Sequence, residues 1–153
     1  MTPLKRILLA EDNDNDVELT LTALAEHNLA NEVVVVRDGA EAWDFLCRDG
    51  AFADRAGGNP AVVLLDLKMP KVDGLELLRR MRQEPRFRAV PVVVLTSSRE
   101  ESDVIQSYRL GVNAFVVKPV AFGEFIEAVK NLGLFWAVLN EPPPDQLQAP
   151  ALA

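Results

Sequence analysis

Short apolar runs with no polar residue inside them recur five times along the chain. They occupy residues 7–10, 33–36, 61–65, 92–95 and 114–117. Uninterrupted runs of this length, rich in β-branched residues, are typical of strands that are buried on both faces. The longer stretches between them space their apolar residues as helices do. This alternation predicts an α/β fold in which a parallel sheet is doubly wound by crossover helices, a (βα)5 arrangement.

Helices are expected between and after these strands. Their predicted ranges are 14–27, 40–47, 73–83, 100–110 and 121–139. The second helix should bury Trp43, and Gly111 suits a left-handed cap after the fourth. Asp38 and Asp73 are interpreted as helix caps or turn residues rather than as ligands. Residues 50–60 contain three glycines and a proline, so a surface loop is expected there.

The length of 153 residues predicts one domain with a tail. We expect the domain to cover residues 1–140 and a proline-rich, flexible tail to cover residues 141–153, with no output domain after it. Hydrophobic residues make up 49% of the chain and charged residues 25%, a balance that allows a buried core. No apolar run approaches the roughly 20 residues that span a bilayer, so neither a membrane anchor nor a signal peptide is expected.

The net charge of -7 repels the nucleic-acid backbone, which disfavours direct binding to DNA or RNA. Cys47 is the only cysteine and His27 the only histidine. They exclude an intramolecular disulfide and a histidine-rich metal site, and they suggest a cytoplasmic protein.

Reactive side chains follow the predicted strands. In an open α/β sheet the crevice beyond the carboxyl ends of the strands holds the site. Glu11 and Asp12 follow the first run, Asp66 the third, Thr96 the fourth and Lys118 the fifth. Packed carboxylates recruit a cation, and oxygen ligands without histidine or thiolate suit Mg²⁺. A carboxylate nucleophile, a hydroxyl and an ammonium group beside that cation predict a phosphoryl-transfer site.

With these residues the chain resembles the receiver domains of two-component response regulators over residues 5–138. The matching features, in chain order, are the pair Glu11-Asp12, the segment Asp66-Leu-Lys-Met-Pro-Lys-Val-Asp-Gly74, Thr96-Ser97 and Lys118-Pro119. Each feature alone is weak evidence for this family, but finding all of them at strand ends in this order is specific to it. The resemblance implies a flavodoxin-like three-layer sandwich with the parallel strand order 2-1-3-4-5.

The resemblance implies that Asp66 is the phosphoacceptor and takes its phosphoryl group from a histidine kinase. It further implies that Asp12, Asp66 and the main-chain carbonyl of Lys68 ligate Mg²⁺ directly, whereas Glu11 acts through water. Such a chain is a signalling protein that assists its own phosphorylation and dephosphorylation, not an enzyme that turns over a substrate.

The resemblance also implies roles for residues near the later strands. Thr96 takes the switch-hydroxyl position, Lys118 pairs with the phosphoryl group, and the Lys118-Pro119 peptide is expected to be cis. Phe115 falls on the aromatic switch position, but it lacks the hydroxyl of the tyrosine often found there.

Three features are the long second loop, the segment Ser107-Tyr-Arg-Leu-Gly-Val-Asn113 before the last strand, and Phe135-Trp136 late in the predicted last helix. Together they resemble stand-alone receivers that partner phytochrome-type histidine kinases. They are expected to act by docking or as a relay. The predicted last helix has more apolar surface than one sheet contact needs, so we expect a homodimer through the fourth helix, the fifth strand and the fifth helix. The candidate interface residues are Tyr108, Phe122, Phe125, Phe135 and Trp136.

Three rival functions are weighed. A Mg²⁺-dependent phosphatase of the aspartyl-nucleophile type has a second acid two positions after the nucleophile, where this chain has Lys68. An FMN carrier needs a phosphate-binding loop after the first strand, where this chain is acidic. A pseudo-receiver that acts only as an interaction module is expected to lack one of the key residues, and none is missing.

Overall fold

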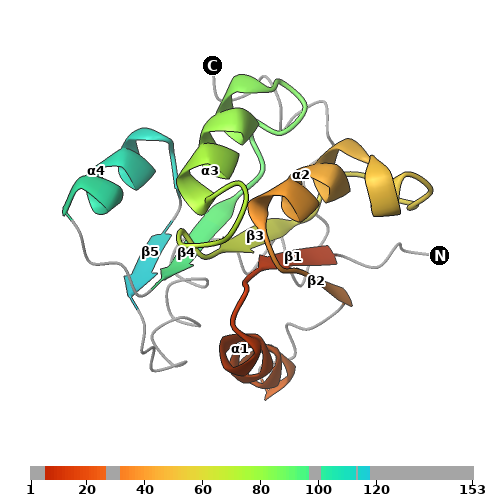
Figure 1. The fold of residues 1–153 in the computed structure, drawn as a ribbon, viewed down its shortest axis with the longest axis horizontal. Coiled ribbons are helices and arrows are strands. Elements are labelled where there is room, and N and C mark those ends of the chain that lie inside the picture. Colours follow the sequence, from red (N-terminus) through yellow and green to blue (C-terminus); the bar gives the residue numbers. More distant parts are fainter. Residues whose placement is uncertain (1–5, 27–31, 97–100, 113, 118–153) are drawn as a thin grey trace.

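The computed structural model describes residues 6–26, 32–96, 101–112 and 114–117. Strands and helices alternate along these residues (Figure 1). In chain order they are β1 (Arg6–Ala10), α1 (Asp14–Glu26), β2 (Glu32–Val36), α2 (Gly39–Cys47), a short 3₁₀ helix η1 (Gly50–Phe52), β3 (Val62–Leu65), α3 (Gly74–Gln83), β4 (Val92–Thr96), α4 (Glu101–Arg109) and β5 (Ala114–Val117). The five strands coincide with the five apolar runs to within one residue at each end.

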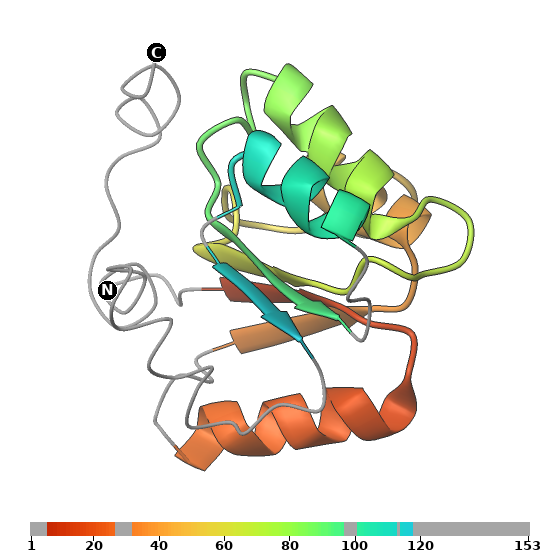
Figure 2. The same ribbon diagram turned by 90° about the vertical axis from the view of Figure 1, so that its left-hand side faces the viewer.

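All five strands are parallel and form one sheet in the order β2-β1-β3-β4-β5. Figure 2 shows α1 against one face of the sheet and α2, α3 and α4 over the other. The predicted doubly wound fold and its strand order are therefore confirmed. The first strand lies between the second and the third, so the chain changes direction across the sheet at β1, which is where such folds place their site.

Helices on both faces explain why the central strands are apolar throughout. Every residue of β3 is buried, and so are the residues of β1 from Ile7 to Ala10. Leu8, Val63 and Leu65 belong to the core that α2 and α3 cover. A strand with a helix on each side has no solvent-facing positions, so its sequence does not alternate between polar and apolar residues.

Side-chain caps fix where two of the helices begin. Asp38 accepts a hydrogen bond from the main-chain N–H of Glu41 at the start of α2, at 2.7 Å. Asp73 accepts one from the N–H of Glu76 at the start of α3, at 2.9 Å. Both aspartates are caps, as expected, and because Asp73 is the cap, α3 begins one residue later than predicted. Gly111, with φ of 77°, takes the expected left-handed conformation.

The segment 50–60 is more structured than the surface loop that its composition predicts. It contains η1, and the Phe52 ring packs edge-on against Phe45 with ring centres 5.2 Å apart. Trp43 is half-buried rather than fully buried, and it contacts Phe87 in the same edge-on way. Aromatic contacts across the fold therefore order a segment whose local sequence indicates a turn.

The predicted fifth helix, the proline-rich tail and His27 lie outside the described residues, so the division into residues 1–140 and 141–153 stays a prediction. None of the helices in the described part of the chain has both the length and the apolar character needed to cross a membrane.

Candidate phosphoryl and metal site

The sheet register brings the acidic residues together. Ala10 at the end of β1 lies opposite Leu65 at the end of β3. The Asp66 N–H donates to the Ala10 carbonyl at 3.0 Å, and the Glu11 N–H donates to the Val36 carbonyl of β2 at 2.9 Å. Because these strands are parallel neighbours, their following residues emerge side by side at one edge of the sheet.

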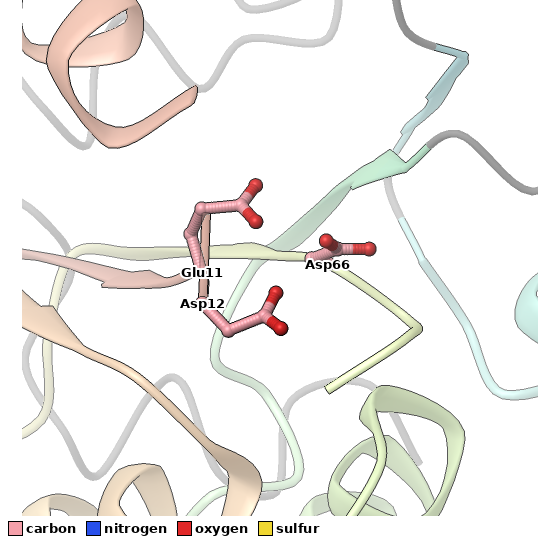
Figure 3. Close-up of side chains that lie close together, drawn as sticks. All are labelled: Glu11, Asp12 and Asp66. Atoms are coloured by element: carbon pink, nitrogen blue, oxygen red, sulfur yellow. The ribbon is translucent and has the colours of Figure 1, made fainter. Parts of the chain in front are cut away.

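Three carboxylates meet at this edge and form the acidic cluster, Glu11, Asp12 and Asp66. One carboxylate oxygen from each lies within 4.8 Å of the others. Figure 3 shows Glu11 and Asp12 reaching from the end of β1 toward the space beside Asp66. Glu11 is 3% exposed and Asp66 7%, whereas Asp12 is exposed to solvent. The cluster thus joins two buried carboxylates to one that solvent reaches.

The chemistry of the acidic cluster fits a small, hard cation. Its side chains supply carboxylate oxygens alone, which Mg²⁺ and Mn²⁺ accept and which zinc sites rarely use without nitrogen or sulfur ligands. The Asn13 N–H donates to Glu11 Oε2 at 3.2 Å, and the Lys68 N–H donates to Asp66 Oδ1 at 3.1 Å. Main-chain donors therefore orient both buried carboxylates.

A close backbone approach holds the loop after Asp66 in place. A Cβ atom on Gly74 would lie 2.4 Å from the Asp66 carbonyl oxygen, closer than real atoms come. The Gly74 N–H also donates to the Leu67 carbonyl at 2.9 Å. Only glycine allows the start of α3 to lie directly against the strand end that carries Asp66.

Two other predicted site residues, Thr96 and Phe115, lie on strands beyond β3. Thr96 is the last residue of β4 and pairs through its backbone with Val117, and Phe115 pairs with Val94. Their side chains are outside the described part of the structure, as are Lys118 and Pro119 in full. The structure therefore places the backbones of Thr96 and Phe115 on neighbouring strands.

An ion pair that the sequence analysis did not anticipate links this loop to α4. Lys68 Nζ lies 3.4 Å from Asp103 Oδ2, and the Asp103 carboxyl is almost fully buried. A second pair joins Lys71 Nζ to Asp38 Oδ2 at 3.5 Å. In the sequence, Asp103 is an ordinary acidic residue in the first turn of a predicted helix. Nothing in the neighbouring residues indicates that it is buried or paired with Lys68.

Tyr108 is one of the expected interface residues and the only one of them within the described residues. It lies on α4 with 56% of its surface exposed, near Ile105 with 42% exposed. Phe122, Phe125, Phe135 and Trp136 fall in the part of the chain that is not described. An apolar surface on α4 is therefore present, and its extension onto the predicted fifth helix stays a prediction.

Comparison with known proteins agrees with this geometry. The family model for the response regulator receiver domain matches residues 7–130. Response regulator Rcp1 of Synechocystis sp. is 38% identical over 134 residues, which are 88% of this chain and 90% of Rcp1. The crystal structure of its Mn²⁺-bound form covers 92% of this chain and 99% of that one, with 36% identity and a TM-score of 0.76.

A second solved structure is more similar in sequence. The bacteriophytochrome response regulator RtBRR is 61% identical, with a TM-score of 0.81, and the alignment covers 96% of this chain and 89% of that one. The family match over residues 7–130 contains β2 to β5, all of β1 but its first residue, and the three residues of the acidic cluster. The chain therefore belongs to the response regulator receiver domain family and has its phosphorylation-accepting signalling function.

Proposed function

We propose that Asp66 is the phosphoacceptor and that the donor is the phosphohistidine of a phytochrome-type histidine kinase. The observation that carries the proposal is the convergence of Glu11, Asp12 and Asp66 within 4.8 Å at the edge of the sheet. In the transfer, an Asp66 carboxylate oxygen forms a bond to phosphorus while the bond from phosphorus to the histidine nitrogen breaks. The electron pair of that bond leaves with the imidazole.

Asp66 suits this role better than its neighbours in the acidic cluster. It comes from the central strand β3, and the Lys68 N–H orients its carboxylate. Asp12 and the Lys68 carbonyl are proposed to complete a direct Mg²⁺ site with Asp66, and Glu11 to act through water. When bound, Mg²⁺ neutralises charge on the phosphoryl oxygens. Thr96 and Lys118 are proposed to contact the same oxygens.

The phytochrome partnership is supported by relatives. RtBRR is named as a bacteriophytochrome response regulator, and it is similar to this chain along nearly its whole length. A response regulator that docks on a cytoplasmic kinase acts in the cytoplasm, so we propose that location. The output is proposed to be a change in protein contacts, with Phe115 as part of the switch and a homodimer through α4, β5 and the predicted fifth helix.

Replacement of the proposed acceptor tests the assignment. Asp66→Asn should keep the fold but lose labelling by acetyl phosphate with Mg²⁺, because the amide has no nucleophilic carboxylate. Intact mass measures the acyl phosphate. Asp73→Asn is the matched control, since asparagine also caps helices and this residue lies outside the acidic cluster. Undiminished labelling of Asp66→Asn would sink the assignment.

Two further measurements separate the alternatives. A phosphatase hydrolyses small phosphomonoesters many times, whereas a receiver yields at most one acyl phosphate per chain. A pseudo-receiver is not labelled at all.

Phosphotransfer profiling against a panel of histidine kinases identifies the donor, and a phytochrome-type kinase should label this chain fastest. Faster labelling by an unrelated kinase would reject the partnership and leave Asp66 as the acceptor.

A further inference from the structure

A second hollow in the structure lies away from the acidic cluster. Its volume is about 390 Å³, and its lining includes Cys47, Arg48, Arg55, Asn59, Arg86 and Phe87. The loop after η1 that forms one wall lies beside the start of β1 (Figure 1). Glu11 follows the other end of β1, and a five-residue strand spans roughly 17 Å. This hollow, the arginine pocket, is therefore separate from the phosphoryl site.

Three arginine side chains hydrogen-bond to the main chain of one turn of the loop. Each donates to a successive main-chain carbonyl: Arg6 to Ala56, Arg48 to Gly57, and Arg55 to Gly58 at 3.0 Å. Arg55 also donates through Nε to the Phe45 carbonyl at 2.7 Å and stacks 4.1 Å above the centre of the Phe45 ring. The contacts of Arg55 hold its side chain in place before any ligand arrives, which lowers the entropy lost on binding.

Two of these arginines, Arg48 and Arg55, form no ion pair within the residues that the structure describes. Both hydrogen-bond to carbonyl oxygens. Burial lowers the pKa of Arg55, and the charges of Arg48 and Arg6 lower it further. Like charges held this close repel one another, and a bound anion relieves that repulsion. The chain as a whole has a net charge of -7, so this group of positive charges is a local feature.

Arg86 is the third arginine in the lining of the arginine pocket. Arg86 pairs with Glu84 through Nε at 3.1 Å, and its guanidinium lies 4.9 Å from the centre of the Phe87 ring. The Asn59 side-chain amide donates to the Arg86 carbonyl at 2.7 Å and so ties the two walls together. The half-buried thiol of Cys47 lines the floor between them.

We propose that the arginine pocket binds a small molecule that carries phosphate groups. The planar fork of arginine matches phosphate oxygens two at a time, and several forks around one hollow suit a ligand with more than one negative charge. Small-molecule sites commonly measure about 300–1,000 Å³, so this hollow has room for a molecule of nucleotide size, well beyond one phosphate ion.

Calorimetric titration with ATP as the probe tests the proposal. The buffer is stripped of divalent cations, so the acidic cluster takes no part. Arg48→Gln should weaken binding at least about tenfold, because it removes a charged donor. Arg37→Gln is the matched control: it removes the same charge from an exposed arginine that pairs with Asp14. No binding of ATP at about 5 mM, or equal loss in both variants, would overturn the proposal.

Two other probes define the ligand. Inorganic phosphate and citrate should both bind at least about tenfold more weakly than ATP, because each fills only part of the hollow or lacks phosphate. Equal binding of inorganic phosphate would overturn the assignment to a larger molecule. Equal binding of citrate would overturn the preference for phosphate.

The single cysteine provides a local readout that does not depend on the arginine variants. Cys47 lines the arginine pocket, so bound ATP should slow its alkylation by iodoacetamide, measured by intact mass. Burial raises the pKa of the Cys47 thiol, so the reaction is followed at mildly alkaline pH, where the thiolate is populated. An alkylation rate unchanged by saturating ATP would place the ligand elsewhere and overturn the proposal.

Discussion

The three residues of the acidic cluster differ in how free their oxygen atoms are. Glu11 is buried, and its Oε2 already accepts a hydrogen bond from the Asn13 N–H. Asp12 is exposed beside it. The exposed Asp12 carboxylate can turn toward a cation more easily than the buried Glu11 carboxylate, which sits against a main-chain donor. Asp12 is therefore the better candidate for direct ligation, with Glu11 acting through water.

Metal affinity should follow this difference. Asp12→Asn should weaken Mg²⁺ binding at least about tenfold, because a direct charged ligand is lost, and Glu11→Gln should weaken it less. Both replacements keep the size of the side chain. Titration of each variant with Mg²⁺, followed by calorimetry, gives the order of the two effects. The reverse order contradicts the assignment of direct and water-mediated roles.

At the scale of elements, Arg82 connects the end of α3 to two other segments. Its Nε donates to the Leu110 carbonyl at 2.7 Å and its Nη2 to the Gly111 carbonyl at 3.1 Å, both just after α4. Its Nη1 reaches the carbonyls of Arg88 and Val90 at 2.8 and 3.0 Å. Burial lowers the pKa of Arg82. One guanidinium thus satisfies carbonyls that the ends of these elements leave unpaired.

Removing this side chain should be costly. We expect Arg82→Met to lower the free energy of unfolding by about 2–3 kcal/mol, because several partly buried carbonyls lose a charged donor at once. Urea denaturation measures the change. Arg79→Met is the control on the same helix, and it should have little effect, since Arg79 only pairs with the exposed Glu76. Similar losses in the two variants would show that Arg82 does not connect these elements as described.

At the scale of the whole molecule, two charged sites and an exposed apolar pair lie on different elements within the described residues. The acidic cluster lies at the carboxyl ends of the strands, and the arginine pocket lies by the start of β1. Tyr108 and Ile105 are exposed on α4, away from both. Exposed aromatic residues of this kind supply much of the energy of protein interfaces. Tyr108 and Ile105 are therefore the candidates on α4 for a contact with a partner.

The expected homodimer can be measured for the unphosphorylated protein and for its beryllofluoride complex. Light scattering at about 100 μM, with and without beryllofluoride, should find a dimer in at least one state, since even a weak interface of roughly -6 to -8 kcal/mol is populated there. Tyr108→Ala should weaken it by about 2 kcal/mol if the tyrosine is central. Leu19→Ala is the control, because Leu19 is equally exposed but lies on α1, across the sheet. A monomer in both states rejects the interface.

The sequence determined the elements and their class, because periodicity and capping are local properties of the chain. The unbroken run 61–65 indicated a strand covered on both sides, and Asp73 marked the start of α3. Placing Asp66 after a central strand followed from the same pattern. The strand-end rule then brought Glu11, Asp12 and Asp66 together, because parallel strands end at one edge of a sheet.

Tertiary structure alone decided which distant side chains meet. The pairing of Lys68 with Asp103, the contacts of Arg82, and the convergence of Arg48 and Arg55 on one loop join residues from separate elements. Their local sequence looks like ordinary charged surface. Their partners depend on how helices pack and where loops cross the edge of the sheet. Periodicity along the chain records which face of an element is buried, but it does not record which polar groups lie across from it.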